Sequence, residues 1–249
     1  MKPSIALQMY SVRHIIGPEL DYATVLRKVG AMGYDGIETA GFPGTTPAAV
    51  LSLCKELGMV VCSAHVSSPV GEKKNEILET LAALECKTLI NTQIGGDDVK
   101  SLDTIKKCCD RLNEGYVNAH AAGLNYGIHN HWWEYGKLGD RYIYHIMREM
   151  LDPGIFFQLD TYWIKTGGVD PAAVVKETGT RCPYLHIKDG PALTGVPMVA
   201  VGDGVMDFPA ILAAGGSNLQ WLIVELDECA SPILPVVEKS CKYLKSIVK

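Results

Sequence analysis

The 249-residue sequence has no run of basic residues, although it contains 23 Lys and Arg side chains. Its net charge is −5, which argues against a nucleic-acid partner because nucleic-acid-binding surfaces concentrate positive charge. No stretch approaches the ~18 to 20 unbroken apolar residues of a membrane span. The first ten residues lack the apolar core of a signal peptide. We therefore expect neither a nucleic-acid partner nor a membrane partner.

The sequence also lacks the short motifs of common cofactor sites. The eight cysteines form no Cys-x-x-Cys pair, and no spacing among them resembles a zinc framework. Several lie in apolar stretches, where cysteine acts as a small hydrophobe, so we expect reduced thiols in a cytoplasmic protein. No Gly-x-Gly-x-x-Gly follows the first predicted strand, and Gly202-x-Gly204 is isolated. An open doubly wound sheet is therefore the weaker alternative for the fold.

Eight short apolar segments alternate with segments of helical spacing along the chain. The predicted strands cover residues 5–10, 36–39, 59–65, 88–91, 124–131, 155–160, 184–188 and 221–226. The predicted helices cover residues 22–32, 46–58, 72–85, 97–122 and 140–150, a segment opened by Asp170-Pro171, and residues 208–214 and 232–247. Eight such repeats predict an α/β protein in which residues 1–249 form a single-domain (β/α)₈ TIM barrel.

One segment, residues 127–135, has an unusual composition: Gly-Ile-His-Asn-His-Trp-Trp-Glu-Tyr. His129 and His131 are one residue apart, so a strand would point both imidazoles to the same face. Glu134 follows within reach of both. A strand end whose histidines bond only to neighbouring groups would show the same pattern, so the other strand ends are needed to decide.

Polar side chains end all eight predicted strands. They are Gln8, Tyr10, Glu38, His65, Asn91, His129, His131, Asp160, His186, Lys188, Glu225 and Asp227. In a TIM barrel the carboxyl ends of the strands meet at one mouth, which carries the active site. Packing alone does not require so many histidines and carboxylates at one place. We therefore predict a functional site at the mouth.

Histidines and carboxylates that converge on one point also form a metal site. The four predicted ligands are His129, Asp160, His186 and Glu225, which end four consecutive strands. His131 or Glu134 is the alternative to His129, because spacing does not choose among them. Mixed oxygen and nitrogen ligands suit Mn²⁺, Co²⁺, Mg²⁺, Fe²⁺ or Zn²⁺, and we expect Mn²⁺ first.

Short motifs along the whole chain resemble one known superfamily. They are LQMYSVR (7–13), GYDGIE (33–38), IHNHWWE (128–134), LDTYW (159–163), HIKD (186–189), VGDGVMDF (201–208) and VELD (224–227). Their order is similar to that of the sugar phosphate isomerase/epimerase superfamily of xylose isomerase-like barrels. That superfamily includes inosose dehydratases, ketose 3-epimerases, hydroxypyruvate isomerases and, more distantly, endonuclease IV.

The resemblance implies metal ligands at Asp160, His186 and Glu225, which lie in clear motif matches. The first ligand of the epimerases is a glutamate, whereas residues 128–130 of this chain are Ile-His-Asn. This departure does not fit a mechanism with two metal-bound glutamates. It makes His129 or Glu134 the substitute in a ligand or base role.

Such a site predicts metal-assisted chemistry on a keto sugar. A divalent metal would chelate the carbonyl and a neighbouring hydroxyl, and would stabilise the enediolate formed when the α-proton leaves. Glu225, Glu134 and His131 are the candidate bases, and Lys188 would stabilise developing negative charge. Return of the proton gives an isomerase or epimerase, which is the predicted function. Loss of a β-substituent gives the alternative, a lyase that dehydrates an inosose-like ring or cleaves a 3-keto glycoside.

Other side chains near the strand ends are predicted to bind the substrate. They are Gln8, Tyr10, Arg13, Glu38, His65, Trp133 and Trp163. Aromatic faces suit the C–H faces of a sugar, but they equally suit a cover over the mouth or a contact in a homo-oligomer. Arg13 would meet a phosphate or carboxylate of the substrate.

Two other functional classes fit the sequence less well. An endonuclease resembling endonuclease IV is disfavoured by the acidic charge balance and by a single set of metal ligands where that enzyme uses several metals. A non-catalytic sugar-binding barrel is disfavoured by the intact ligand set.

Overall fold

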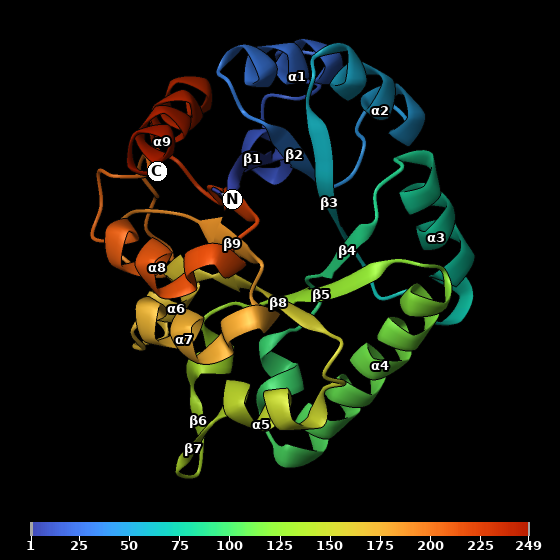
Figure 1. Ribbon diagram of the computed structural model, residues 1–249, viewed down its shortest axis with the longest axis vertical. Helices are drawn as coiled ribbons and strands as arrows, with labels where there is room; N and C mark the ends of the chain where they lie inside the picture. The colour runs from blue at the N-terminus through green and yellow to red at the C-terminus, as the bar shows by residue number, and fades with distance from the viewer. Residues whose placement is uncertain (1, 249) are drawn as a thin grey trace.

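The computed structural model describes residues 2–248, in which eight parallel strands close into a barrel surrounded by helices (Figure 1). The barrel strands are β1 (Ser4–Gln8), β2 (Gly36–Thr39), β3 (Val60–Val66), β4 (Thr88–Asn91), β5 (Asn125–His129), β8 (Phe156–Asp160), β9 (Tyr184–Ile187) and β10 (Trp221–Val224). Their order around the ring is β1-β10-β9-β8-β5-β4-β3-β2, and β1 also pairs with β2. The predicted TIM barrel is confirmed.

Helices connect the strands on the outside of the barrel (Figure 1). They are α1 (Tyr22–Ala31), α2 (Pro47–Glu56), α3 (Lys74–Ala83), α4 (Leu102–Ala121), α5 (Ile143–Met150), α6 (Thr161–Thr166), α7 (Pro171–Thr178), α8 (Phe208–Gly215) and α9 (Ile233–Ile247). Capping side chains fix where several begin, because each accepts a hydrogen bond from a free backbone N–H of the first turn. Asp21 accepts from Thr24 N, and Ser101 accepts from Thr104 N, so α4 starts later than the predicted residue 97.

The structure contains two features that the sequence pattern does not predict. An antiparallel hairpin of β6 (Lys137–Leu138) and β7 (Arg141–Tyr142) follows β5. Helix α6 begins directly after β8, because the Asp160 side chain accepts a hydrogen bond from Trp163 N at 2.8 Å. Elements of two to six residues are too short to leave a periodic pattern.

The barrel interior is apolar at its amino-terminal end. A cluster of inward side chains fills it, made of Ala6, Cys62, Tyr184 and Ile223 with Phe156 and Trp221. Gly127 on β5 leaves the room that this packing needs. A Cβ at that position would lie 2.5 Å from the Phe156 ring, so no larger residue fits without a shift. Polar residues therefore collect above this plug, towards the carboxyl ends of the strands.

Two whole-chain properties match the composition. No helix within residues 2–248 combines the length and the hydrophobicity needed to cross a bilayer. The eight cysteines all have free thiols.

Candidate active site

Glu38 on β2 is the centre of a buried hydrogen-bond network, which we call the floor network and which comprises Gln8, Glu38, Ser63 and Gln158. Glu38 Oε1 accepts a hydrogen bond from Gln8 Nε2 at 2.7 Å. Its Oε2 accepts from Ser63 Oγ at 2.5 Å and from Gln158 Nε2 at 2.6 Å. A register irregularity between β2 and β3 places Ser63 opposite Glu38.

The floor network is closed to a substrate. All four of its residues are 0% exposed. The two polar side-chain atoms of Gln8 are both engaged, since Oε1 also accepts from Tyr10 N at 3.1 Å. Gln8 and Glu38 were expected to contact the substrate, but both are buried below the mouth. Their placement suits the positioning of other side chains instead.

His186 on β9 connects the floor network to the groups above it. Its Nε2 lies 2.6 Å from Glu38 Oε1, and its Nδ1 lies 2.8 Å from Glu225 Oε2. Burial alone would lower the pKa of His186, but these two carboxylates raise it to about 10. Burial would raise the pKa of Glu38, but His65 and His186 hold it well below its usual range. The ionised Glu38 therefore fixes the orientation of the His186 ring.

Gln158 on β8 sets the protonation of His129. Its amide nitrogen donates to Glu38, so its Oε1 is the acceptor that faces His129 Nδ1 at 3.1 Å. His129 Nδ1 must then carry the proton, which leaves a lone pair on Nε2. Burial lowers the pKa of His129 well below its usual value, with a further contribution from His186. The ring is therefore neutral and its Nε2 is available as a ligand.

The four predicted metal ligands come together above the floor network. His129, Asp160, His186 and Glu225 each contribute an atom that lies within 4.8 Å of the others. Asp160 Oδ2 is buried and accepts no hydrogen bond, but it lies 3.0 Å from the Lys188 ammonium and 3.7 Å from His129 Nε2. Burial raises the pKa of Asp160 to about 6, against the opposing charge of Lys188. Two imidazoles and two carboxylates fit a divalent metal, and ligation itself stays a prediction.

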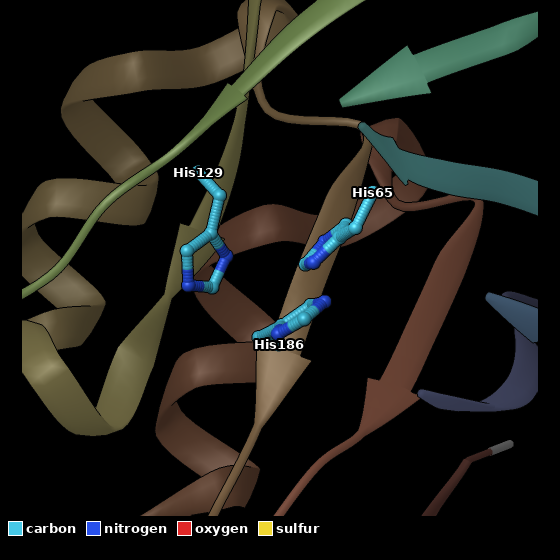
Figure 2. Close-up of side chains that lie close together, drawn as sticks. All are labelled: His65, His129 and His186. Carbon is cyan, nitrogen blue, oxygen red and sulfur yellow. The ribbon is translucent and has the colours of Figure 1, made fainter. Parts of the chain in front are cut away.

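A second group of possible ligands, His65, His129 and His186, is shown in Figure 2. The three rings come from β3, β5 and β9 and face one another, with centroids 4.6 to 5.3 Å apart. His65 Nε2 and His129 Nδ1 both lie against Gln158 Oε1, at 2.8 and 3.1 Å. Because an amide oxygen only accepts, these two nitrogens are committed to protons. Each of these two rings keeps only its other nitrogen as a possible ligand, and the group contains no carboxylate, so it suits Mn²⁺ or Mg²⁺ less well than the four-ligand set.

The Lys188 side chain forms ion pairs with the two carboxylates of the four-ligand set. Its Nζ lies 3.0 Å from Asp160 Oδ2, 2.8 Å from Glu225 Oε2 and 2.6 Å from Asp227 Oδ2. The side chain is 1% exposed, and Nζ also lies 5.2 Å from the centre of the Trp163 ring. Burial alone would lower the pKa of Lys188, but the three carboxylates raise it well above its usual value. Lys188 is therefore a buried ammonium ion.

An open pocket of about 430 Å³ lies at the carboxyl ends of the strands. Its lining residues are Tyr10, Ala40, His65, Thr92, His129, His131, Lys188, Glu225 and Asp227. We call this space the mouth pocket. Its volume is in the range of ~300 to 1,000 Å³ that is typical of small-molecule sites.

His131 lines the mouth pocket beside His129, although the strand itself ends at His129. Its ring stacks on Trp133 with centroids 4.4 Å apart, and its Nδ1 is buried without a hydrogen-bond partner. Burial lowers the pKa of His131 to about 4, with Lys188 contributing in the same direction. The imidazole is therefore neutral and is not engaged by the four-ligand set.

Glu134 does not face the mouth pocket. It lies in a 3₁₀ turn (Trp133–Tyr135), where its Oε2 accepts a hydrogen bond from His131 N at 3.0 Å. Its Oε1 is buried without a partner, and the residue borders a separate cavity lined by β5, β8 and α5. Burial raises the pKa of Glu134 to about 8. Glu225, His131 and Lys188, the other predicted catalytic residues, line the mouth pocket, whereas Glu134 does not.

The predicted rim contacts are mostly engaged with the protein itself. Arg13 stacks 3.8 Å above the Tyr10 ring centre, donates to Asp227 O at 2.6 Å and pairs with Glu228 at 3.2 Å. Trp133 Nε1 donates to Ile94 O at 3.2 Å, and Trp163 is 8% exposed. Neither tryptophan lines the mouth pocket, whereas Tyr10 and His65 do.

The sequence pattern did not single out three residues that the structure places at or below the site. They are Ser63, Thr92 and Gln158. For Gln158 the pattern was available, because it lies two residues before Asp160 in an otherwise apolar strand. A glutamine there faces inward with Asp160 and needs a partner. Nothing comparable marks Ser63, whose position depends on the irregular pairing of β2 and β3.

Comparisons with solved structures show the same fold. A sugar phosphate isomerase/epimerase from Parabacteroides distasonis is 23% identical, with a TM-score of 0.79 over 100% of this chain and 96% of that chain. The probable 3-DHS dehydratase AsbF from Bacillus anthracis is 15% identical, with a TM-score of 0.77 over 98% and 99% of the two chains. The IolI protein with a bound zinc atom is 15% identical, with a TM-score of 0.76 over 98% of each chain.

At these identities the structural likeness shows the fold alone. No match was found among proteins of curated function. A family model described as xylose isomerase-like TIM barrel matches residues 26–247, which is most of the chain. The resemblance in the sequence is therefore confirmed, and the chain belongs to the xylose isomerase-like TIM barrel family.

Proposed function

We propose that the protein is a divalent-metal-dependent isomerase or epimerase that acts on a keto sugar or a sugar derivative. One observation carries this proposal. The ligand-type atoms of His129, Asp160, His186 and Glu225 lie within 4.8 Å of one another beside an open pocket that two of these residues line. The fold is shared with a protein named as a sugar phosphate isomerase/epimerase and with a zinc-bound one, which supports the reaction class and the metal.

Two of the proposed ligands are oriented for metal binding, and a metal would replace the proton that His186 Nδ1 shares with Glu225. Gln158 keeps the proton of His129 on Nδ1, and Glu38 holds His186 through Nε2 so that Nδ1 faces Glu225. Such partners orient metal-binding imidazoles. A divalent metal held there would act as a Lewis acid on a substrate carbonyl. Mn²⁺ is the first metal to test, and the zinc in the IolI structure makes Zn²⁺ the second.

His131 is the proposed base. It lines the mouth pocket, is neutral because burial lowers its pKa to about 4, and lies outside the four-ligand set. It would take a proton from the carbon next to the carbonyl and return it to the other face or the neighbouring carbon, a role typically worth ~10² to 10⁴-fold. Glu225 is the alternative base. Lys188 would stabilise negative charge on a substrate oxygen.

A lyase is the second candidate, because Lys188 offers an acid at the mouth pocket. Its ammonium could protonate a leaving hydroxyl after the α-proton has been removed. A protein named as a probable dehydratase shares the fold. The lyase and the isomerase would use the same first step and differ only in which bond changes next.

Solvent exchange separates these functions. The protein would be incubated with a panel of keto sugars and Mn²⁺ in D₂O, with product formation and deuterium content followed by NMR. Deuterium next to the carbonyl without release of water or an aglycone supports the isomerase or epimerase. Release of either identifies a lyase, and nicking of abasic DNA identifies a nuclease. Neither exchange nor turnover with Mn²⁺, Co²⁺ or Zn²⁺ would contradict all three and favour a sugar-binding barrel.

Two further predictions concern the protein outside its site. The cytoplasmic location that the free thiols suggest would be tested by cell fractionation. The homo-oligomer suggested by the aromatic residues near the mouth would be tested by light scattering.

A further inference from the structure

Lys188 pairs with both carboxylates of the proposed metal site. Its Nζ contacts Asp160 Oδ2 at 3.0 Å and Glu225 Oε2 at 2.8 Å, within the group of possible ligands. A metal binds carboxylate oxygens at about 2.0 to 2.2 Å and carries two positive charges. An ammonium and a metal on the same two oxygens would repel each other strongly at such distances. The observed position of Lys188 therefore opposes metal binding at these two carboxylates.

The chain provides a second position for the displaced ammonium. Asp227 Oδ2 lies 2.6 Å from Lys188 Nζ, which is the shortest of its three ion pairs. The Asp227 side chain is 31% exposed, compared with 0% for Asp160 and 6% for Glu225. Lys188 and Asp227 both line the mouth pocket. A lysine has four rotatable bonds, so its ammonium can leave the two buried oxygens and keep the third.

We infer that Lys188 is an internal counter-ion of the metal site, which an entering metal displaces onto Asp227 at the mouth pocket. This inference rests on the proposed metal site. Without metal, the ammonium neutralises Asp160 and Glu225 and keeps the buried carboxylates stable. With metal, the same ammonium moves towards the substrate side, where it becomes available to a substrate oxygen. Metal loading and the charge of the mouth pocket are thereby coupled through one side chain.

A double-mutant cycle on metal affinity tests this displacement. Calorimetric titration with MnCl₂ would be carried out on the wild type, Lys188→Met, Asp227→Asn and the double variant. Lys188→Met removes the competing ammonium. It should tighten Mn²⁺ binding by at least about tenfold, because the metal no longer has to displace Lys188. Asp227→Asn should weaken binding several-fold in the wild type, because the displaced ammonium loses its second partner.

The double variant separates displacement from a simple charge effect. If Asp227 acts by receiving Lys188, Asp227→Asn should have no effect in the Lys188→Met background. Equal weakening in both backgrounds would mean that Asp227 acts only through its charge, and would overturn the inference while leaving the metal site in place. Binding to neither the wild type nor Lys188→Met would overturn both. Glu228→Gln is the matched control, because Glu228 pairs with Arg13 and not with Lys188.

A measurement on the wild type covers the case in which Lys188→Met does not fold. Lys188 is 1% exposed with its ammonium against three carboxylates, so an amine-reactive reagent should modify it slowly. Addition of Mn²⁺ should increase the modification of Lys188 several-fold, as measured by mass spectrometry of its peptide. The other lysines serve as the internal reference. An unchanged or slower modification of Lys188 in the presence of bound Mn²⁺ would overturn the inference.

Discussion

The floor network and the mouth of the barrel contain similar side chains, but their polar atoms differ in how completely they are paired. Around Glu38, the amides of Gln8 and Gln158 and the hydroxyl of Ser63 all donate to one carboxylate. Towards the mouth, His131 Nδ1 is equally buried and has no hydrogen-bond partner, and Asp160 Oδ2 accepts no hydrogen bond although Lys188 Nζ lies 3.0 Å away.

This difference separates a structural task from a functional one. Buried polar groups in proteins are nearly always paired, and an unpaired one costs about 1 to 3 kcal/mol. A protein retains such an unpaired group at a site where a bound ligand supplies the missing partner. We therefore expect changes in the floor network to reduce stability, and changes at the mouth to reduce function while the fold stays intact.

The largest effect should come from Glu225→Gln at the mouth. The variant keeps the size of the side chain but loses the negative charge that faces His186 and Lys188. We expect kcat/KM to fall by at least about 10³-fold, because electrostatic stabilisation of the transition state is a major part of such catalysis. Circular dichroism should show an unchanged fold. Glu228→Gln, three residues further along, is the control, and full activity of Glu225→Gln would refute the site assignment.

Glu38→Gln, in the floor network, should reduce the stability of the fold rather than the activity alone. The variant places an amide N–H₂ against side chains that all donate to Glu38, and it leaves the His186 cation without one of its two carboxylates. We expect the free energy of unfolding to fall by about 3 to 5 kcal/mol, as when one partner of a buried ion pair is removed. Urea denaturation measures this loss. Ser63→Ala, which removes only one donor to the same carboxylate, should cost no more than about half as much.

Gln158 belongs to both regions, so its replacement tests where the boundary lies. Gln158→Met is similar in volume but removes the acceptor that holds His129 Nδ1 and the donor to Glu38. We expect Mn²⁺ affinity to fall by about 10- to 100-fold, the usual effect of losing a group that orients a metal ligand. Asn91→Ala on β4 is the control, since Asn91 donates to Ser68 and not to this site. A loss of stability with unchanged Mn²⁺ affinity would assign Gln158 to the floor network alone.

The sequence alone was sufficient to predict the barrel and the ring of polar residues at the strand ends. The strands could be predicted because apolar segments recur at regular spacing between helices, and closure follows from their number. The alternation of side chains along a strand then identifies which residues face inward. That rule places Asp160 and His186 on adjacent strands, where β8 and β9 pair them directly.

Alternation does not give depth along the barrel axis or the path of the chain beyond a strand. Gln8 and Tyr10 are two residues apart and were both predicted to bind substrate, but Gln8 lies in the floor network and only Tyr10 reaches the mouth pocket. Glu134 was predicted from its distance in sequence to His131. The chain leaves the strand after His129 and turns, so Glu134 points into another cavity.

Glu134 is an exception to the difference between the floor network and the mouth. It has an unpaired buried atom but lies outside the mouth pocket. Its pKa is raised by burial from 4.5 to about 8, so the folded protein holds a proton on Glu134 that the unfolded chain releases above pH 4.5. That contribution to stability is complete below pH 4.5 and is lost as the pH rises towards 8.

In Glu134→Gln, stability relative to the wild type should therefore improve by about 1.4 kcal/mol from pH 6 to pH 7, measured by urea denaturation. Glu149→Gln, an exposed change on α5, should show no such trend. A pH-independent difference for Glu134→Gln would mean that Glu134 is ionised when folded, and that an unpaired buried atom can persist with neither a ligand nor a proton to satisfy it.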